Sequence, residues 1–180
     1  MLRVFIPAAE YFDELNEEFV YVAEQHLTLE HSLVSVSKWE QKWHKPFLTD
    51  NKKTREENID YVRCMTLTQN VDPRVYMGIP DSVMEEIMAY IDDPRTAAIF
   101  PEEKNAKTSR EIITNETIYY WMIALEIPSE YQKWHLNHLL ALIRFCNIKN
   151  KPAKKMSRKE ILAQNRALNE ARRKASGSRG

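Results

Sequence analysis

Residues 107–150 read KTSREIITNETIYYWMIALEIPSEYQKWHLNHLLALIRFCNIKN and hold the densest apolar material of the chain. Thr108 and Glu111 have the spacing of a capping box, in which two side chains satisfy backbone N–H groups at the start of a helix. A helix is therefore predicted to begin near Ser109. Residues 119–127 include one strongly polar side chain, so this helix is apolar nearly all round. Such a helix is expected to be central and covered on several sides.

A second helix is predicted directly after a proline. Pro128 cannot donate a backbone hydrogen bond and disfavours helix at the residue before it. Ser129 and Gln132 then offer another capping box. The apolar residues that follow recur at helical spacing, at Leu136, Leu139, Leu140 and Ile143. The whole stretch is typical of a central helical hairpin.

Glycine is scarce along the whole chain. Gly78 is the single glycine before Gly177 and Gly180. Phosphate-binding loops, dinucleotide fingerprints and the turn around a catalytic serine all need closely spaced glycines, so these enzyme classes are excluded. Tight hairpin turns also favour glycine, which argues against a sheet of many strands. With 43% hydrophobic and 29% charged residues, the chain is predicted to form a compact, mainly helical domain.

A small β element is predicted at the N-terminus. Leu2–Ile6 and Phe19–Val22 are rich in β-branched and aromatic residues, as strands are, and are expected to pair. A polar stretch separates them. His26–Glu30 alternates apolar and polar residues and is a candidate third strand.

Helical spacing begins at Ser32–His44, which is predicted to be a helix. Trp39 and Trp43 share one face of it. With the lysines around them they could stack on nucleic-acid bases. Core packing is the favoured interpretation, because tryptophan buries a large area. Further helices are predicted from a capping box at Thr54 and Glu57, from Asp72-Pro73, and from Asp81 or Ser82.

The compartment is expected to be the cytoplasm. The longest apolar run, residues 119–125, is far below the roughly 20 residues that span a bilayer. Leu2–Ile6 is too short for the apolar region of a secretory signal. Cys64 and Cys146 show no paired spacing, which fits a reducing compartment in which both are buried thiols.

Charge divides the chain. The 32 residues from 149 to 180 contain eleven Lys and Arg against two acidic residues, a balance of +9, whereas the other 148 residues carry 15 basic and 24 acidic side chains, a balance of −9. We therefore predict a helical body over residues 1–150 and a basic helical tail over residues 151–180, which ends in disorder after residue 174. Such a tail is expected to contact something negative: nucleic acid, an acidic partner or another copy of the body.

The tail is the predicted partner-binding segment. Ser157 and Glu160 form a further capping box. The helix behind it has only a thin apolar stripe, so a partner is expected to cover it. Nucleic acid is the less favoured partner, because the tail has no aromatic side chain to stack on bases. The candidate contact residues are Lys154, Lys155, Arg158, Lys159, Ile161, Leu162, Arg166, Leu168, Arg172 and Arg173.

Signals for catalysis or metal binding are weak. His135 and His138 lie three apart on one predicted helix, without the other ligands that a zinc site needs. The favoured interpretation is hydrogen-bonded histidines at the edge of the core. A nucleophilic cysteine would need a histidine that only the fold can bring near it. No catalytic residue, metal or cofactor is predicted.

Three stretches carry a resemblance to a known family. They read LTLEHSLVSVSKWEQKWHKPF (27–47), EIITNETIYYWMIALEIPSEYQKWHLNHLLALIRFCNIKN (111–150) and KKMSRKEILAQNRALNEARRK (154–174). Together they resemble the tail assembly chaperones of long-tailed, siphovirus-type bacteriophages over about half of the chain. The resemblance is one of whole phrases and includes no catalytic signature.

The resemblance implies a non-enzymatic, helical protein in the cytoplasm of the infected bacterial host. Such chaperones bind the tape measure protein and help tail tube subunits polymerise around it. Self-association is a further expectation, and no membrane partner is expected. Two alternatives stay open: a minor structural protein of the tail or head-tail junction, and a small nucleic-acid-binding regulator that uses the basic tail.

Overall fold

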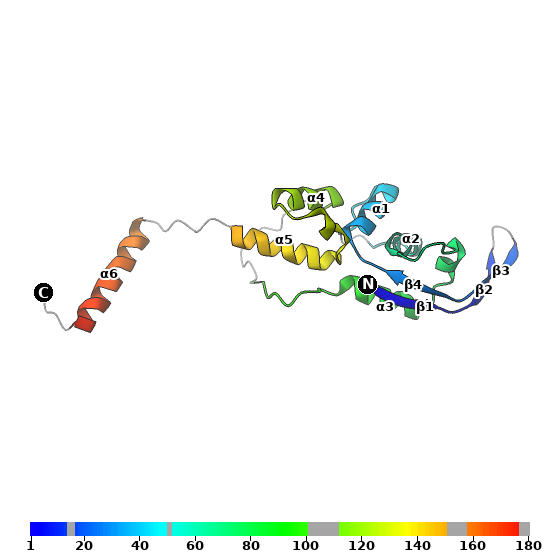
Figure 1. Cartoon of the computed structure of the whole chain (residues 1–180), viewed down its shortest axis with the longest axis horizontal. Helices are drawn as coiled ribbons and strands as arrows, with labels where there is room; N and C mark the ends of the chain where they lie inside the picture. The colour runs from blue at the N-terminus through cyan, green and yellow to red at the C-terminus, as the bar shows by residue number, and fades with distance from the viewer. Residues whose placement is uncertain (14–16, 50–51, 101–111, 151–157, 177–180) are drawn as a thin grey trace. The chain divides into compact units, whose positions relative to one another are not determined.

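The computed structural model describes the chain except residues 14–16, 50–51, 101–111, 151–157 and 177–180 (Figure 1). It divides into two compact units, residues 1–146 and residues 147–180. The first unit contains a β-ribbon and a set of helices, and the second contains one long helix, α6. The predicted mainly helical fold with a small N-terminal β element is confirmed.

The β element is one bent, two-stranded ribbon. Strand β1 (Leu2–Ile6) pairs antiparallel with β4 (Gln25–Leu29), and β2 (Ala9–Asp13) pairs with β3 (Glu18–Val22). The predicted pairing of β1 with residues 19–22 is therefore wrong. Both strand pairs instead share the register of a single hairpin. Part of the stretch that was expected to separate the strands is therefore strand β2.

The ribbon changes its buried face at the bend. In β1 the buried positions are Val4 and Ile6, but in β3 they are Val20 and Val22, which pair with odd-numbered residues of β2. Along the first strand the buried side thus changes from even-numbered to odd-numbered residues, and the paired strand changes at the same height of the ribbon, around Pro7. Since successive side chains of a strand point to opposite faces, opposite faces of the ribbon meet the core on the two sides of the bend.

Helices α1 (Leu33–Trp43) and α2 (Arg55–Met65) follow the ribbon in the chain and pack next to each other. Ser32 caps α1, and Thr54 with Glu57 forms the predicted capping box of α2, so both predicted helix starts are confirmed. After α2 the chain returns to β4, where the Leu67 N–H donates to the Thr28 carbonyl at 2.8 Å.

The next two elements also begin where the sequence indicates. The 3₁₀ helix η1 (Pro73–Gly78) follows Asp72, and α3 (Asp81–Asp92) begins at the first of the two predicted start residues and ends two residues before Pro94. Val75 and Tyr76 of η1 are buried, and η1 contacts β2 and β3. Helix α3 lies against β1 and buries Ile87.

The predicted helical hairpin corresponds to α4 (Asn115–Ala124) and α5 (Leu136–Asn150), with the 3₁₀ helix η2 (Ser129–Lys133) between them. Two details of the prediction are wrong. Residues 112–114 are not helical, so α4 does not begin near Ser109; the proposed cap at Thr108 and Glu111 lies outside the described residues. Ser129 starts η2 without a side-chain cap, and α5 begins seven residues later.

Helix α4 is not the fully covered central helix that its composition predicts. Ile118 and Met122 are buried on one side, whereas Tyr120 is 66% exposed and Ile123 is 77% exposed on another. Helix α1, whose sequence is less apolar, buries Leu33, Val36 and Trp39 almost fully. Apolar content alone therefore did not identify the central helix.

Helix α6 (Arg158–Ser176) forms the second unit with the end of α5. It ends two residues after the predicted end at Lys174. The predicted cap residue Ser157 lies outside the described residues. Within the helix, the Lys174 ammonium lies 3.3 Å from the Glu170 carboxylate, one turn earlier, a pairing that supports exposed helices.

Candidate functional site

The predicted partner-binding residues form an exposed helix surface wherever they are described. Ile161, Leu162 and Leu168 of α6 are between 45% and 53% exposed. The basic candidates Arg158, Lys159, Arg166, Arg172 and Arg173 are also exposed, and Lys154 and Lys155 lie outside the described residues.

These α6 side chains can bind a partner but provide little chemistry. An aliphatic stripe flanked by Lys and Arg suits a groove with apolar walls and an acidic rim. The aliphatic side chains of the stripe cannot act as nucleophile, acid or base. Sequence reasoning found this surface through its helical spacing and its charge.

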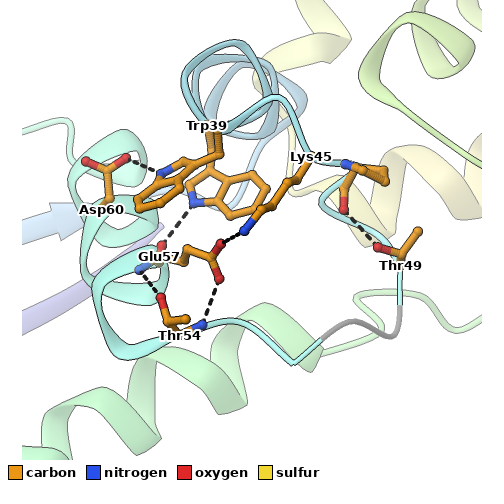
Figure 2. A network of polar contacts seen from close by, with 8 residues as sticks. Trp39, Lys45, Thr49, Thr54, Glu57 and Asp60 are labelled. Atoms are coloured by element: carbon orange, nitrogen blue, oxygen red, sulfur yellow. Dashed lines mark hydrogen bonds and ion pairs between the residues drawn. The ribbon is translucent and has the colours of Figure 1, made fainter.

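The two tryptophans of α1 pack against each other and against α2. Trp39 is 1% exposed, and its Nε1 donates to the Glu57 carbonyl at 2.9 Å (Figure 2). Trp43 stacks on Trp39, and its Nε1 donates to an Asp60 carboxylate oxygen at 2.9 Å. The interpretation as a core anchor is confirmed for Trp39, whereas Trp43 is partly buried against the core.

Glu57 joins three parts of this region (Figure 2). Its carboxylate accepts from the Thr54 N–H at 2.7 Å and from the Lys45 ammonium at 2.5 Å. Its carbonyl accepts from Trp39, so α1, the following loop and α2 meet at one residue. The hydrogen bonds from Lys45 and Thr54 lower the pKa of Glu57 below its ordinary value.

A second buried carboxylate, Glu40, fixes the start of α4. One oxygen accepts from the Phe47 N–H at 2.6 Å. The other accepts from the Asn115 N–H at 2.8 Å and from its side-chain amide at 2.6 Å. An anion at the first residue of a helix satisfies orphan N–H groups and complements the helix dipole. This contact was not predicted, because its two residues are 75 positions apart.

A polar cluster lies between β4, α2, α3 and α5. The buried His31 hydrogen-bonds through Nδ1 to the Tyr61 hydroxyl at 2.5 Å, and its ring lies 5.0 Å from that of His135. Nε2 of His135 donates to the Tyr90 carbonyl at 3.0 Å. The Tyr90 hydroxyl donates to Glu30 at 2.8 Å. The cluster joins elements that are distant in sequence.

Burial keeps the histidines of this cluster uncharged. Burial, with the nearby His135, lowers the pKa of His31 to about 3. Burial also lowers the pKa of His135 and raises that of Tyr61. A pocket of about 300 Å³ adjoins His31, Tyr61 and Lys53. Because a base with a pKa near 3 is weak at neutral pH, His31 is poorly tuned for general-base catalysis there.

The remaining chemical candidates have structural surroundings. His138, the other member of the predicted pair, stacks on Trp134 at 4.7 Å between ring centroids. Within the described residues, no group of three or more His, Cys, Asp or Glu side chains could hold a metal ion. Both cysteines are half-buried free thiols, less buried than predicted, and burial raises the pKa of the Cys64 thiol to about 11. Deprotonation of Cys64 is therefore disfavoured.

The comparisons with known proteins give no family. No family model matches the chain, and neither curated proteins nor solved structures give a significant match. In the described part of the chain, no helix is both long and apolar enough to cross a bilayer.

Proposed function

We propose that this chain is a non-enzymatic tail assembly chaperone of a long-tailed bacteriophage, which binds the tape measure protein and assists tail tube polymerisation. The resemblance of residues 27–47, 111–150 and 154–174 to that family suggests the biological role. One structural observation supports it most directly: α6 leaves its apolar stripe and its described basic side chains exposed.

An exposed amphipathic helix is suited to binding another protein. The isoleucine and leucines of α6 are too few to hold a helix of this length in an ordered fold by their own burial. A partner that covers them would stabilise the helix and gain affinity from apolar area, with basic side chains at its acidic rim. A tape measure protein, with long helical segments to be kept soluble, fits this requirement.

The test is co-expression of the full chain with the tape measure protein encoded beside it, followed by affinity capture and measurement of soluble tape measure protein. We expect capture with the wild-type chain and a large loss with Ile161→Gln/Leu168→Gln. Glutamine keeps helix propensity, so the loss would report the apolar stripe and not the helix. Ala163→Gln/Ala167→Gln is the matched control outside the stripe and should retain capture.

Other results would favour the alternatives. Absence of capture, with the chain found by mass spectrometry in purified virions, would reject the chaperone and favour a minor structural protein of the tail or head-tail junction. Absence of capture, with DNA or RNA binding that falls steeply as salt rises, would favour the nucleic-acid-binding regulator. Equal capture by the wild-type chain and the stripe variant would remove α6 from the binding site.

A further inference from the structure

The outer half of the β-ribbon has an aromatic face that the fold leaves uncovered. Phe12, Phe19 and Tyr21 are 50%, 71% and 66% exposed. Phe12 and Phe19 are directly paired across the strands, with ring centroids 5.2 Å apart. Tyr21 lies two residues from Phe19 and therefore on the same face. We call these three side chains the aromatic face.

The opposite side of the same ribbon explains why this face is uncovered. Val20 and Val22 are buried, and β2 and β3 contact η1. The bend at Pro7 has already turned the other side of the ribbon to the core. This part of the ribbon thus packs on the core through small valines and exposes its large aromatic rings. Large apolar side chains are usually the buried ones.

The stretch of chain that carries the aromatic face has charged residues of one sign. Residues 9–24 contain six acidic side chains and no Lys or Arg. Glu10, Glu17 and Glu24 are exposed. Such a field repels nucleic-acid phosphates and anionic lipid headgroups, and it attracts cationic protein segments.

We propose that the aromatic face is a docking surface for a cationic amphipathic helix of a partner protein. Sheet faces pack against the apolar stripe of a helix. Aromatic rings give such a contact large area and accept cation–π contacts from Lys and Arg at its flanks. The acidic side chains supply the charge complementarity. None of its residues belongs to α6, so the inference does not depend on the proposed function.

The test uses the full chain and a labelled synthetic peptide of Leu, Lys and Ala, designed as a helix with one leucine stripe, in a fluorescence-anisotropy titration. Binding to the wild-type chain should weaken about tenfold when salt is raised from low to high concentration. Phe12→Thr/Phe19→Thr and Glu10→Lys/Glu24→Lys should each weaken binding about tenfold or more. Threonine favours strands, so the ribbon should persist, and circular dichroism checks this.

Matched controls distinguish binding at the aromatic face from nonspecific hydrophobic binding and from an effect of net charge. Tyr120→Gln/Ile123→Gln removes exposed apolar side chains of α4, and Glu85→Lys/Glu86→Lys reverses an exposed acidic pair of α3. Both should bind the peptide within twofold of the wild-type chain. If the controls weaken binding as much as the ribbon variants, the aromatic face is not the site.

Two further outcomes would overturn the stated occupant. Equal binding of a peptide in which two prolines break the helix would refute recognition of a helix. If light scattering shows that the full chain self-associates, and the ribbon variants abolish this, the occupant is a second copy and not a different protein. Absence of peptide binding to the wild-type chain would reject the docking surface, whatever the result of tape measure capture.

Discussion

The buried His31 should make the folded protein sensitive to mild acid. Its pKa is lowered to about 3 in the folded state, against about 6.5 for an unfolded histidine. Between these values the unfolded chain binds a proton that the folded chain does not. Stability is therefore greatest above pH 6.5 or so and falls as the pH drops towards 3.

The size of the effect follows from the distance between the pH and the unfolded pKa. At about pH 5 the unfolded histidine is about 1.5 pH units below its pKa, which costs the folded state about 2 kcal/mol relative to neutral pH. This pH is above the ordinary pKa of Asp and Glu, so paired carboxylates such as Glu57 contribute little to the change. His135, whose pKa is also lowered, adds to it in the same direction.

The assay is urea unfolding followed by tryptophan fluorescence, at about pH 7 and about pH 5. His31→Gln keeps a partner for the Tyr61 hydroxyl but cannot take up a proton in this range. Its loss of stability on acidification should be about 2 kcal/mol smaller than that of the wild-type chain. His26→Gln, at an exposed histidine, is the control and should follow the wild type.

An equal loss in the wild-type chain and His31→Gln would refute the reasoning. So would an NMR titration that finds an ordinary pKa for His31 in the folded protein. Either result would mean that the cluster admits water or opens before its histidine is protonated.

Three more predictions concern single residues. Thr54→Ala removes the cap of α2 and should cost about 1 kcal/mol in urea unfolding; an unchanged midpoint would reject the cap. Glu40→Ala leaves the buried N–H groups of Asn115 unpaired and should cost about 3 kcal/mol, with faster amide exchange at the start of α4; unchanged exchange would contradict this. In Cys146→Ser, Cys64 should react with a disulfide reagent at neutral pH about 100-fold more slowly than a free thiol, because its pKa is about 11; comparable rates would show that the thiol is not desolvated.

Local signals were enough for part of the fold. The capping box at Thr54 and Glu57 and the stop after Asp92 lie within a few residues, so the sequence shows them directly. The sequence does not show the start of α4 in this way, because a carboxylate of Glu40, on another helix, binds the first N–H of α4. The capping-box spacing of Thr108 and Glu111 favoured a helix start further upstream, but residues 112–114 are not helical.

The candidate sites divide in the same way. The exposed stripe of α6 was predictable, because a 19-residue helix with few apolar residues has little to bury. The aromatic face was missed, because its strand β2 contains acidic residues that usually disfavour strands. Its exposure depends on the face change at Pro7, which alternation within one strand does not reveal.

The face change at Pro7 also limits how the length of this hairpin can evolve. A single residue inserted into or deleted from one strand at the bend would turn every later side chain of that strand over, placing phenylalanine against η1 and valine in water. One residue added to both strands would keep their pairing but would still turn both outer strands over, so changes in length are expected as two residues before the turn together with two after it. Related sequences should show this coupling as paired gaps around positions 7–8 and 23–24.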